Sequence, residues 1–387
     1  MWTPTRGRRR LPPVASVSRL VLRVLVFCLA ASLSIHAQHA GAAAREVFPD
    51  GAIAEIDAAA ENPSMHAEEP GRESNPAAAV EPTWVLSRDS AGNVDQKIKV
   101  QSDFAVGDSV RLGLLLGQDF VYNSLPQSGF NTQDIRQAGV TSQWHPNDAV
   151  KFEAMVGVSQ LGSTTANDRP VRQAFIPISK VQALLTPPGG VVKVDVEFKR
   201  FIFDLSPELV ANRAVRNDFV LHPQVSLPSG WRFRELAEMG PVTSTGESNA
   251  RYNSEFTVGH KLGKASELYS TYSALHYAQA SAAGYFSPDL VQNIAGGWTT
   301  DLDRKSLSLS LDLGAGAGHA RAHGSDFGPW GLSLEAQSYL TWSLHSGREL
   351  RASYEFYYDQ SNPAVAESPS GAWHMSVLTV SFRWARK

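Results

Sequence analysis

Cysteine is almost absent from this chain of 387 residues, because the sequence contains only one, Cys28. A single cysteine cannot close a disulfide within the chain, and Cys28 lies in a segment that we expect to be removed. The mature protein is therefore expected to have no disulfide framework and no thiol chemistry. Charge is also scarce, since 19% of residues are charged and the formal net charge is −3. This balance argues against nucleic acid as a partner, because nucleic-acid binders usually present a basic face.

Long hydrophobic runs are missing as well. A membrane-spanning helix needs about 20 apolar residues, and the apolar stretch at residues 20–35 is interrupted by Arg23, which leaves 24–35. The residues before this stretch include four arginines, Arg6, Arg8, Arg9 and Arg10. A short apolar run after a basic region, with Ala37 at a suitable cleavage position, is typical of a secretory signal. The sequence predicts a signal peptide over residues 1–37; the alternative is an uncleaved anchor.

Residues 38–82 contain few large apolar side chains and are rich in Ala, Glu, Pro, Ser and Asn. Such a segment buries too little apolar surface to offset the chain entropy that folding removes. The sequence predicts a disordered periplasmic linker over residues 38–82.

From Trp84 onward, apolar and polar residues alternate with a period of two, which is typical of β-strands. In residues 306–317, one face carries Leu307, Leu309, Leu311, Leu313, Ala315 and Ala317, and the other carries Ser306, Ser308, Ser310, Asp312, Gly314 and Gly316. A soluble β-sandwich also alternates, but its strands centre on about 5–6 residues. The alternating stretches here run to about 10–14 residues, the length of a tilted strand that crosses a bilayer.

About sixteen such stretches follow one another, and their connections alternate between short and long. Short ones lie near 187–190 and 303–304, and longer ones near 205–212, 241–249 and 319–329. Tight turns at one rim and long loops at the other are typical of outer-membrane barrels. The sequence therefore predicts an all-β, transmembrane, antiparallel up-and-down β-barrel of about 16 strands over residues 83–387, in the bacterial outer membrane. Its expected surroundings are outer-membrane lipid and lipopolysaccharide.

The last strand and the tryptophans support this prediction. Leu378, Val380, Phe382 and Trp384 share one face of an aromatic-ended strand, which resembles the signal read by the barrel-assembly machinery. Most tryptophans lie near strand ends, where amphipathic rings suit the headgroup zone. The alternative is that they are ordinary core residues.

Several short segments resemble the C-terminal barrel of the cellulose synthase operon C family of polysaccharide exporters. They include residues 204–209, residues 212–217, the strand that begins at Asp303, the final strand, and the motif Gly284, Tyr285, Phe286, Ser287 and Pro288. The resemblance covers about half the chain and implies polysaccharide export, with a synthase complex or a periplasmic repeat protein as partner. Members usually carry tetratricopeptide repeats before the barrel, and no 34-residue period is present here. The chain is either a separate exporter subunit or a relative with another role.

Charged residues on the polar face of the strands are the predicted site, because charge on the lipid side costs about 2–4 kcal/mol at the midplane. We expect these to line the lumen: Lys151, Glu153, Lys193, Asp195, Glu197, Lys199, Glu255, Lys261, Asp312, Glu335, Arg351, Glu355 and Arg383. They form either a hydrated path for a polar solute or a salt-bridged wall. Mixed signs suit neutral sugars better than a selective ion filter. Tyrosines 269, 277, 339 and 357 share this face and either stack on sugar rings or lie at the interface.

No catalytic motif and no metal-binding spacing stands out. His319 and His323 are four residues apart but fall where a strand meets a loop, so we interpret them as polar loop residues. The expected function is a channel without cofactor or metal, exporting a cellulose-like polysaccharide. The alternatives are a closed structural or docking barrel, a general porin and, least favoured, a barrel enzyme. Loops near 319–329 or 360–372, or the linker, are the candidates for a plug.

Overall fold

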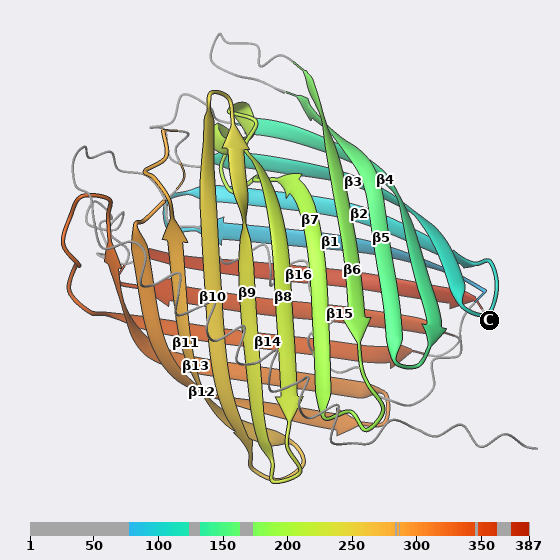
Figure 1. Cartoon of the computed structure of the whole chain (residues 1–387). Helices are drawn as coiled ribbons and strands as arrows, with labels where there is room; N and C mark the ends of the chain where they lie inside the picture. Colours follow the sequence, from blue (N-terminus) through green and yellow to red (C-terminus); the bar gives the residue numbers. More distant parts are fainter. Residues whose placement is uncertain are drawn as a thin grey trace, which may run out of the picture. The chain divides into compact units, whose positions relative to one another are not determined.

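The computed structural model describes residues 77–123, 132–162, 173–282, 285, 287–344, 347–361 and 373–386. Consecutive strands pair antiparallel, and β1 pairs with β16, so the sheet closes into a sixteen-stranded barrel. Figure 1 shows the inclined strands, with the first and last lying side by side. The predicted all-β up-and-down barrel is confirmed.

Within the described residues, the strands follow one another along the chain, and one short helix lies between β7 and β8. Their bounds are β1 Ala78–Asp89, β2 Asn93–Ala105, β3 Val110–Asn123, β4 Thr132–Asn147, β5 Val150–Gly162, β6 Ala174–Leu185, β7 Val192–Ile202, α3 Pro207–Ala211, β8 Val215–Ser226, β9 Trp231–Ser244, β10 Glu247–Lys261, β11 Ser266–Tyr277, β12 Leu290–Arg304, β13 Leu307–Arg321, β14 Gly331–Leu344, β15 Arg348–Asp359 and β16 Trp373–Arg386. Within the described ranges, no helix is both long and apolar enough to cross a bilayer.

The barrel begins earlier than expected, because β1 starts at Ala78 and not after the predicted linker boundary at residue 82. Ala78, Ala79 and Val80 pair with β2 and with β16, and this satisfies their backbone groups. The composition of these residues resembles that of the segment before them, so the sequence pattern did not reveal the strand. The predicted signal peptide and the linker up to residue 76 lie outside the described residues.

Connections alternate between two rims. The strand ends joined by 106–109, 148–149, 186–191, 227–230, 262–265, 305–306 and 345–347 lie at the short-turn rim. The strand ends joined by 90–92, 124–131, 163–173, 203–214, 245–246, 278–289, 322–330 and 360–372 lie at the long-loop rim. The prediction of a long loop at 241–249 is wrong, because residues 241–244 extend β9 and pair with β10. The connection is Thr245–Gly246, where Gly246 has a φ of 84° that favours glycine.

The outer face of the sheet is apolar and exposed, and the inner face is polar. A soluble β-sandwich has the opposite arrangement, with its apolar faces buried. On β3, Leu112, Leu114 and Leu116 are 44%, 52% and 60% exposed on the outer face, whereas Arg111 and Asp119 are buried on the inner face. The other strands follow the same alternation, with exposed apolar side chains such as Val140 outside. An exposed apolar belt around a polar interior fits a barrel whose solvent is lipid.

The outer belt gives the first testable expectation. Val156 lies on the outer face near the middle of β5 and is 68% exposed. The change Val156→Arg is expected to reduce the free energy of unfolding in lipid vesicles by about 2–4 kcal/mol, since charge at the bilayer midplane is costly.

The matched control is Val191→Arg, in a connection of the short-turn rim. It is expected to cost less than about 1 kcal/mol, because arginine near the interface is tolerated. Urea-induced unfolding, followed by tryptophan fluorescence, measures both variants. Equal losses would contradict a lipid-facing Val156.

Candidate functional site: the barrel interior

All the charged residues predicted to line the lumen lie on the inner face of their strands. On β7, Phe198 points outward and is 43% exposed, and its neighbours Glu197 and Lys199 point inward and are buried. The same alternation holds on β5, β10, β13, β14, β15 and β16. The structure thus brings the predicted set to one continuous inner wall.

Near the short-turn rim, these side chains remain partly exposed. The ammonium of Lys151 lies 2.9 Å from the carboxylate of Glu153, and their side chains are 29% and 27% exposed. Arg351 contacts Glu349, and its guanidinium lies 3.6 Å from Glu81. Exposed ion pairs of this kind contribute little to stability, so this part of the interior is a hydrated, charged wall.

Farther from the short-turn rim, the inner wall of β7–β10 holds a buried ion cluster, defined here as Lys199, Arg216, Asp218, Glu238 and Arg251. Arg251 donates to Glu238 at 2.8 Å, and Arg216 pairs with Asp218 at 2.6 Å. Arg216 and Lys199 each lie 3.9 Å from Glu238. Glu238 is therefore surrounded by three cations in a site without solvent.

Residues 203–214, which we call the inner segment, connect β7 to β8 and turn into the barrel. Ser206 caps the helix by accepting a hydrogen bond from the Leu209 amide at 3.3 Å, and Pro207 occupies the first turn. The chain leaves the helix through Arg213, whose φ of 55° is left-handed. These local features fix a short helix, α3, inside the barrel at the long-loop rim.

The inner segment contacts the wall on three sides. Val210 packs in a cluster with Val121, Ile135, Leu161, Ile176 and Ile178 of β3–β6. Leu209 packs in a second cluster with Val242, Leu275 and Tyr277 of β9 and β11. Leu205 touches this second cluster and a third one, formed by Val85, Met375 and Val377 of β1 and β16. The segment therefore crosses the interior and obstructs it.

An ion pair ties the inner segment to the opposite wall. The Lys97 ammonium lies 2.9 Å from Asp204 and 3.0 Å from Asp95. Asp204 is 4% exposed, so water screens this pair only weakly.

Of the three candidates for a plug, the connection at 319–329 is wrong. His319 points outward from β13, and its ring stacks on Phe327 at 4.3 Å and on Trp330 at 4.0 Å between centroids. This connection therefore packs on the outer face. Most of 360–372 and the linker lie outside the described residues.

The motif that carried the family resemblance also packs against the inner segment. Tyr285 is buried, and its ring centroid lies 5.6 Å from that of Phe203 and 5.5 Å from that of Tyr277. Burial raises the pKa of the Tyr285 phenol, which donates to Glu247 at 3.3 Å. Pro288 accepts from the Tyr277 amide at 3.0 Å. Ser287 accepts from the Ser281 amide, while Gly284 and Phe286 lie outside the described residues.

Sequence reasoning identified the inner segment as a motif but missed its place in the barrel. The available signal was three large apolar residues, Leu205, Leu209 and Val210, in a connection between polar ends. Such residues in a loop need a surface on which to pack, and in a barrel that surface is the interior.

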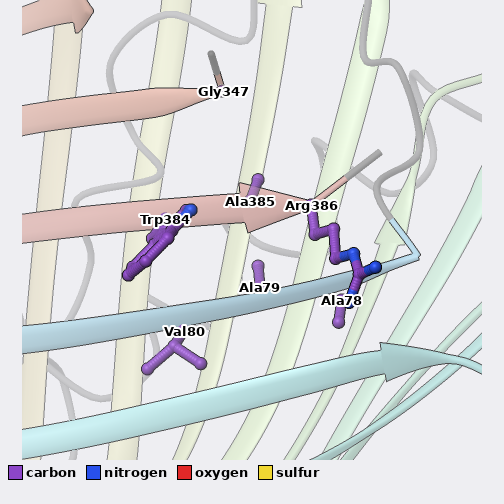
Figure 2. A pocket seen from close by; sticks show the side chains of 7 residues that line it. All are labelled: Ala78, Ala79, Val80, Gly347, Trp384, Ala385 and Arg386. Carbon is purple, nitrogen blue, oxygen red and sulfur yellow. The ribbon is translucent and has the colours of Figure 1, made fainter.

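A cavity of about 790 Å³ lies at the short-turn end of the β1–β16 seam. Figure 2 shows its lining, which consists of Ala78, Ala79, Val80, Gly347, Trp384, Ala385 and Arg386. The pairing of β1 with β16 is interrupted next to this cavity. The paired residues pass from Val80–Trp384 directly to Thr83–Ser381, and Pro82 in this gap lacks an amide proton. Arg386 is the one ionisable residue of this lining, so no acid–base pair is present there.

Among the described residues, no group of His, Cys, Asp and Glu is arranged to hold a metal ion.

Comparison with known proteins informs the fold. No family model matches the sequence, and no curated protein matches it. A solved structure described as a bacterial polysaccharide outer membrane secretin superposes with a TM-score of 0.59 and 10% identity, covering 81% of this chain and 100% of that one. Pseudomonas aeruginosa OccD3 and opdK match at TM-scores of 0.41 and 0.39, each with 10% identity, over 82% and 79% of this chain and 93% and 98% of theirs. The chain has the fold and the apolar outer belt of a bacterial outer-membrane barrel.

Proposed function

We propose that this chain is an outer-membrane channel for a polar solute, and that the solute is a polysaccharide. The observation that carries the proposal is the hydrated inner wall near the short-turn rim, where Lys151, Glu153 and Arg351 are inward and partly exposed. A closed barrel of sixteen strands encloses an aqueous lumen unless something fills it. The polar wall provides a path on which a hydrated solute keeps its hydrogen bonds.

Three considerations favour a polysaccharide. The inner wall carries both signs of charge, which suits a long neutral solute better than a filtered ion. The segments around 204–209 and 284–288 resemble those of cellulose synthase operon C exporters. The solved structure described as a bacterial polysaccharide outer membrane secretin shares the barrel fold. On this proposal, the partners are a polysaccharide synthase complex or a periplasmic repeat protein, together with the assembly machinery and the outer-membrane lipids.

The inner segment favours a second candidate, a closed barrel with a structural or docking role. Its apolar side chains contact three sides of the interior, as a permanent plug also would. Single-channel recording in planar bilayers separates the two candidates. In the wild-type chain, a channel gives discrete conductance steps, whereas a barrel closed permanently by the inner segment gives none and conducts only when that segment is replaced.

Ion selectivity tests whether the charged wall lines the path. Lys193→Ala removes a positive charge near the short-turn rim and is expected to shift selectivity toward cations. Glu197→Ala removes the carboxylate that lies 3.0 Å from Lys180 and is expected to shift it toward anions. The reversal potential in a salt gradient should move by a few millivolts to tens of millivolts, in opposite directions for the two variants.

The control is Phe198→Leu, on the outer face of the same strand and next to Glu197 in the sequence. All variants are also made in a chain whose inner segment is replaced by a flexible linker, so that closure does not mask the effect. An unchanged reversal potential in both charge variants would contradict an ion path along β7.

A further inference from the structure

Three tyrosines lie on one side of the barrel interior, on strands other than those that hold the buried ion cluster. They share this side with three carboxylates and one amide on the same inner face. We call the following seven residues the tyrosine wall: Tyr269 on β11, Asp312 on β13, Glu335, Gln337 and Tyr339 on β14, and Glu355 and Tyr357 on β15. Strand pairing places them on adjacent rows, with Glu335 opposite Tyr357 and Gln337 opposite both Asp312 and Glu355.

Tyr269 lies along the wall because two glycines make room for its ring. A Cβ atom at Gly297 on β12 would overlap the Tyr269 ring, and one at Gly314 on β13 would lie 3.2 Å from its hydroxyl. That hydroxyl donates to Asp312 at 2.6 Å. The ring therefore extends from β11 across β12 to β13 along the inner wall. The guanidinium of Arg234 lies over this ring, 5.9 Å from its centroid.

One hydrogen-bond network holds the other two tyrosines. Tyr339 donates to the Gln337 carbonyl oxygen at 2.8 Å, and the Gln337 amide donates to the Tyr357 hydroxyl at 3.1 Å. Tyr357 in turn donates to Glu355 at 3.0 Å. Tyr357 also packs beside the cluster of Val85, Met375 and Val377 that Leu205 touches. The tyrosine wall thus extends as far as the inner segment. The hydrogen bonds hold the side chains of Tyr339 and Tyr357 in defined rotamers.

This combination matches the chemistry of a saccharide. Pyranose rings present C–H faces that pack on aromatic rings, and their hydroxyls donate to carboxylate and amide oxygens. The three carboxylates of the wall are Asp312, Glu335 and Glu355, of which Glu355 is buried and holds Tyr357, and none of the seven residues carries positive charge. Fixed negative charge repels an anionic ligand, so it discriminates against acidic sugars.

We propose that the tyrosine wall is a saccharide-binding site that accepts uncharged sugar residues and rejects uronate residues. This inference rests on the proposed function and specifies where in the barrel, and to which class of sugar, the polysaccharide binds. Access is from the short-turn rim, where the interior is hydrated.

Calorimetric titration of the full chain in an amine-oxide detergent, which carries no sugar headgroup, tests the site with cellohexaose as the probe. We expect cellohexaose to bind and hexagalacturonate to bind at least about tenfold more weakly. Tyr269→Ala and Tyr357→Ala should each weaken cellohexaose binding by about tenfold. Tyr339→Phe, which keeps the ring and loses the hydroxyl donor, should weaken it less and guards against misfolding of the alanine variants.

The matched control is Tyr354→Ala on β15, because Tyr354 points outward and is 46% exposed. Cellohexaose affinity that is unchanged in both alanine variants overturns the proposal, and so does equal affinity for hexagalacturonate. Bilayer recordings distinguish a failure of the proposed binding site from a failure of the proposed channel. Conductance without cellohexaose binding refutes the site and leaves the channel, whereas binding without conductance in any form refutes the channel and leaves the site.

Discussion

Replacing residues 205–212 with a Gly-Ser linker of equal length is expected to raise single-channel conductance by roughly an order of magnitude, because sixteen strands otherwise leave an aqueous channel. The wild-type interior is obstructed where Leu205, Leu209 and Val210 reach three different parts of the wall. A Gly-Ser linker has no apolar side chains to hold it there, so it behaves as a flexible coil. Planar-bilayer recording of wild type and variant at the same salt measures the difference.

The control exchanges the connection at 322–330 for an equal linker. Its aromatic residues stack on the outward His319, so its loss should leave conductance unchanged. A milder variant, Asp204→Asn, keeps the apolar contacts but removes the ion pair with Lys97. It should increase the frequency of openings without changing their size. If the linker variant conducts no better than the wild type, the inner segment does not close the barrel.

The strands were predictable because alternation carries a physical meaning in lipid. Leu112, Leu114 and Leu116 must face the apolar solvent, so Arg111 and Asp119 must face inward, and the pattern reveals both faces at once. The errors fell where this signal is weak. At 241–249, proline, glycine and small polar residues read as a loop. Pairing with β10 outweighed that local signal.

The candidate site was predictable only in part, since alternation assigns a side chain to a face but not to a partner. It placed Glu197 and Lys199 inside the barrel, yet it could not show that Lys199 approaches Glu238 across β8. The Lys97–Asp204 pair joins residues 107 positions apart, and no local rule predicts it. Likewise, the glycines beneath Tyr269 acquire a meaning only when β11, β12 and β13 are placed side by side.

The largest stability effect is expected at Glu238, because three buried cations lie around its carboxylate. Arg251 lies 2.8 Å from this carboxylate, and Arg216 and Lys199 lie 3.9 Å from it. Glu238→Gln removes the charge at nearly constant volume. Asp218, paired with Arg216, and Glu197, 3.8 Å from Lys199, then remain near two of the three cations. Breaking a buried pair from one side costs about 3–5 kcal/mol, since an uncompensated charge stays in a medium of low polarity. Urea-induced unfolding in vesicles measures the loss of free energy.

Two comparisons decide whether this loss arises from burial of charge or from the mere removal of a carboxylate. Glu153→Gln breaks the partly exposed pair with Lys151 and should cost less than about 1 kcal/mol. The double variant Glu238→Gln with Arg251→Met should be more stable than Glu238→Gln alone, because it removes a buried positive charge together with the carboxylate that it contacts. Equal losses for Glu238→Gln and Glu153→Gln, with no recovery in the double variant, would mean that water reaches the cluster. The interior of β7–β10 would then be part of the hydrated path and not its wall.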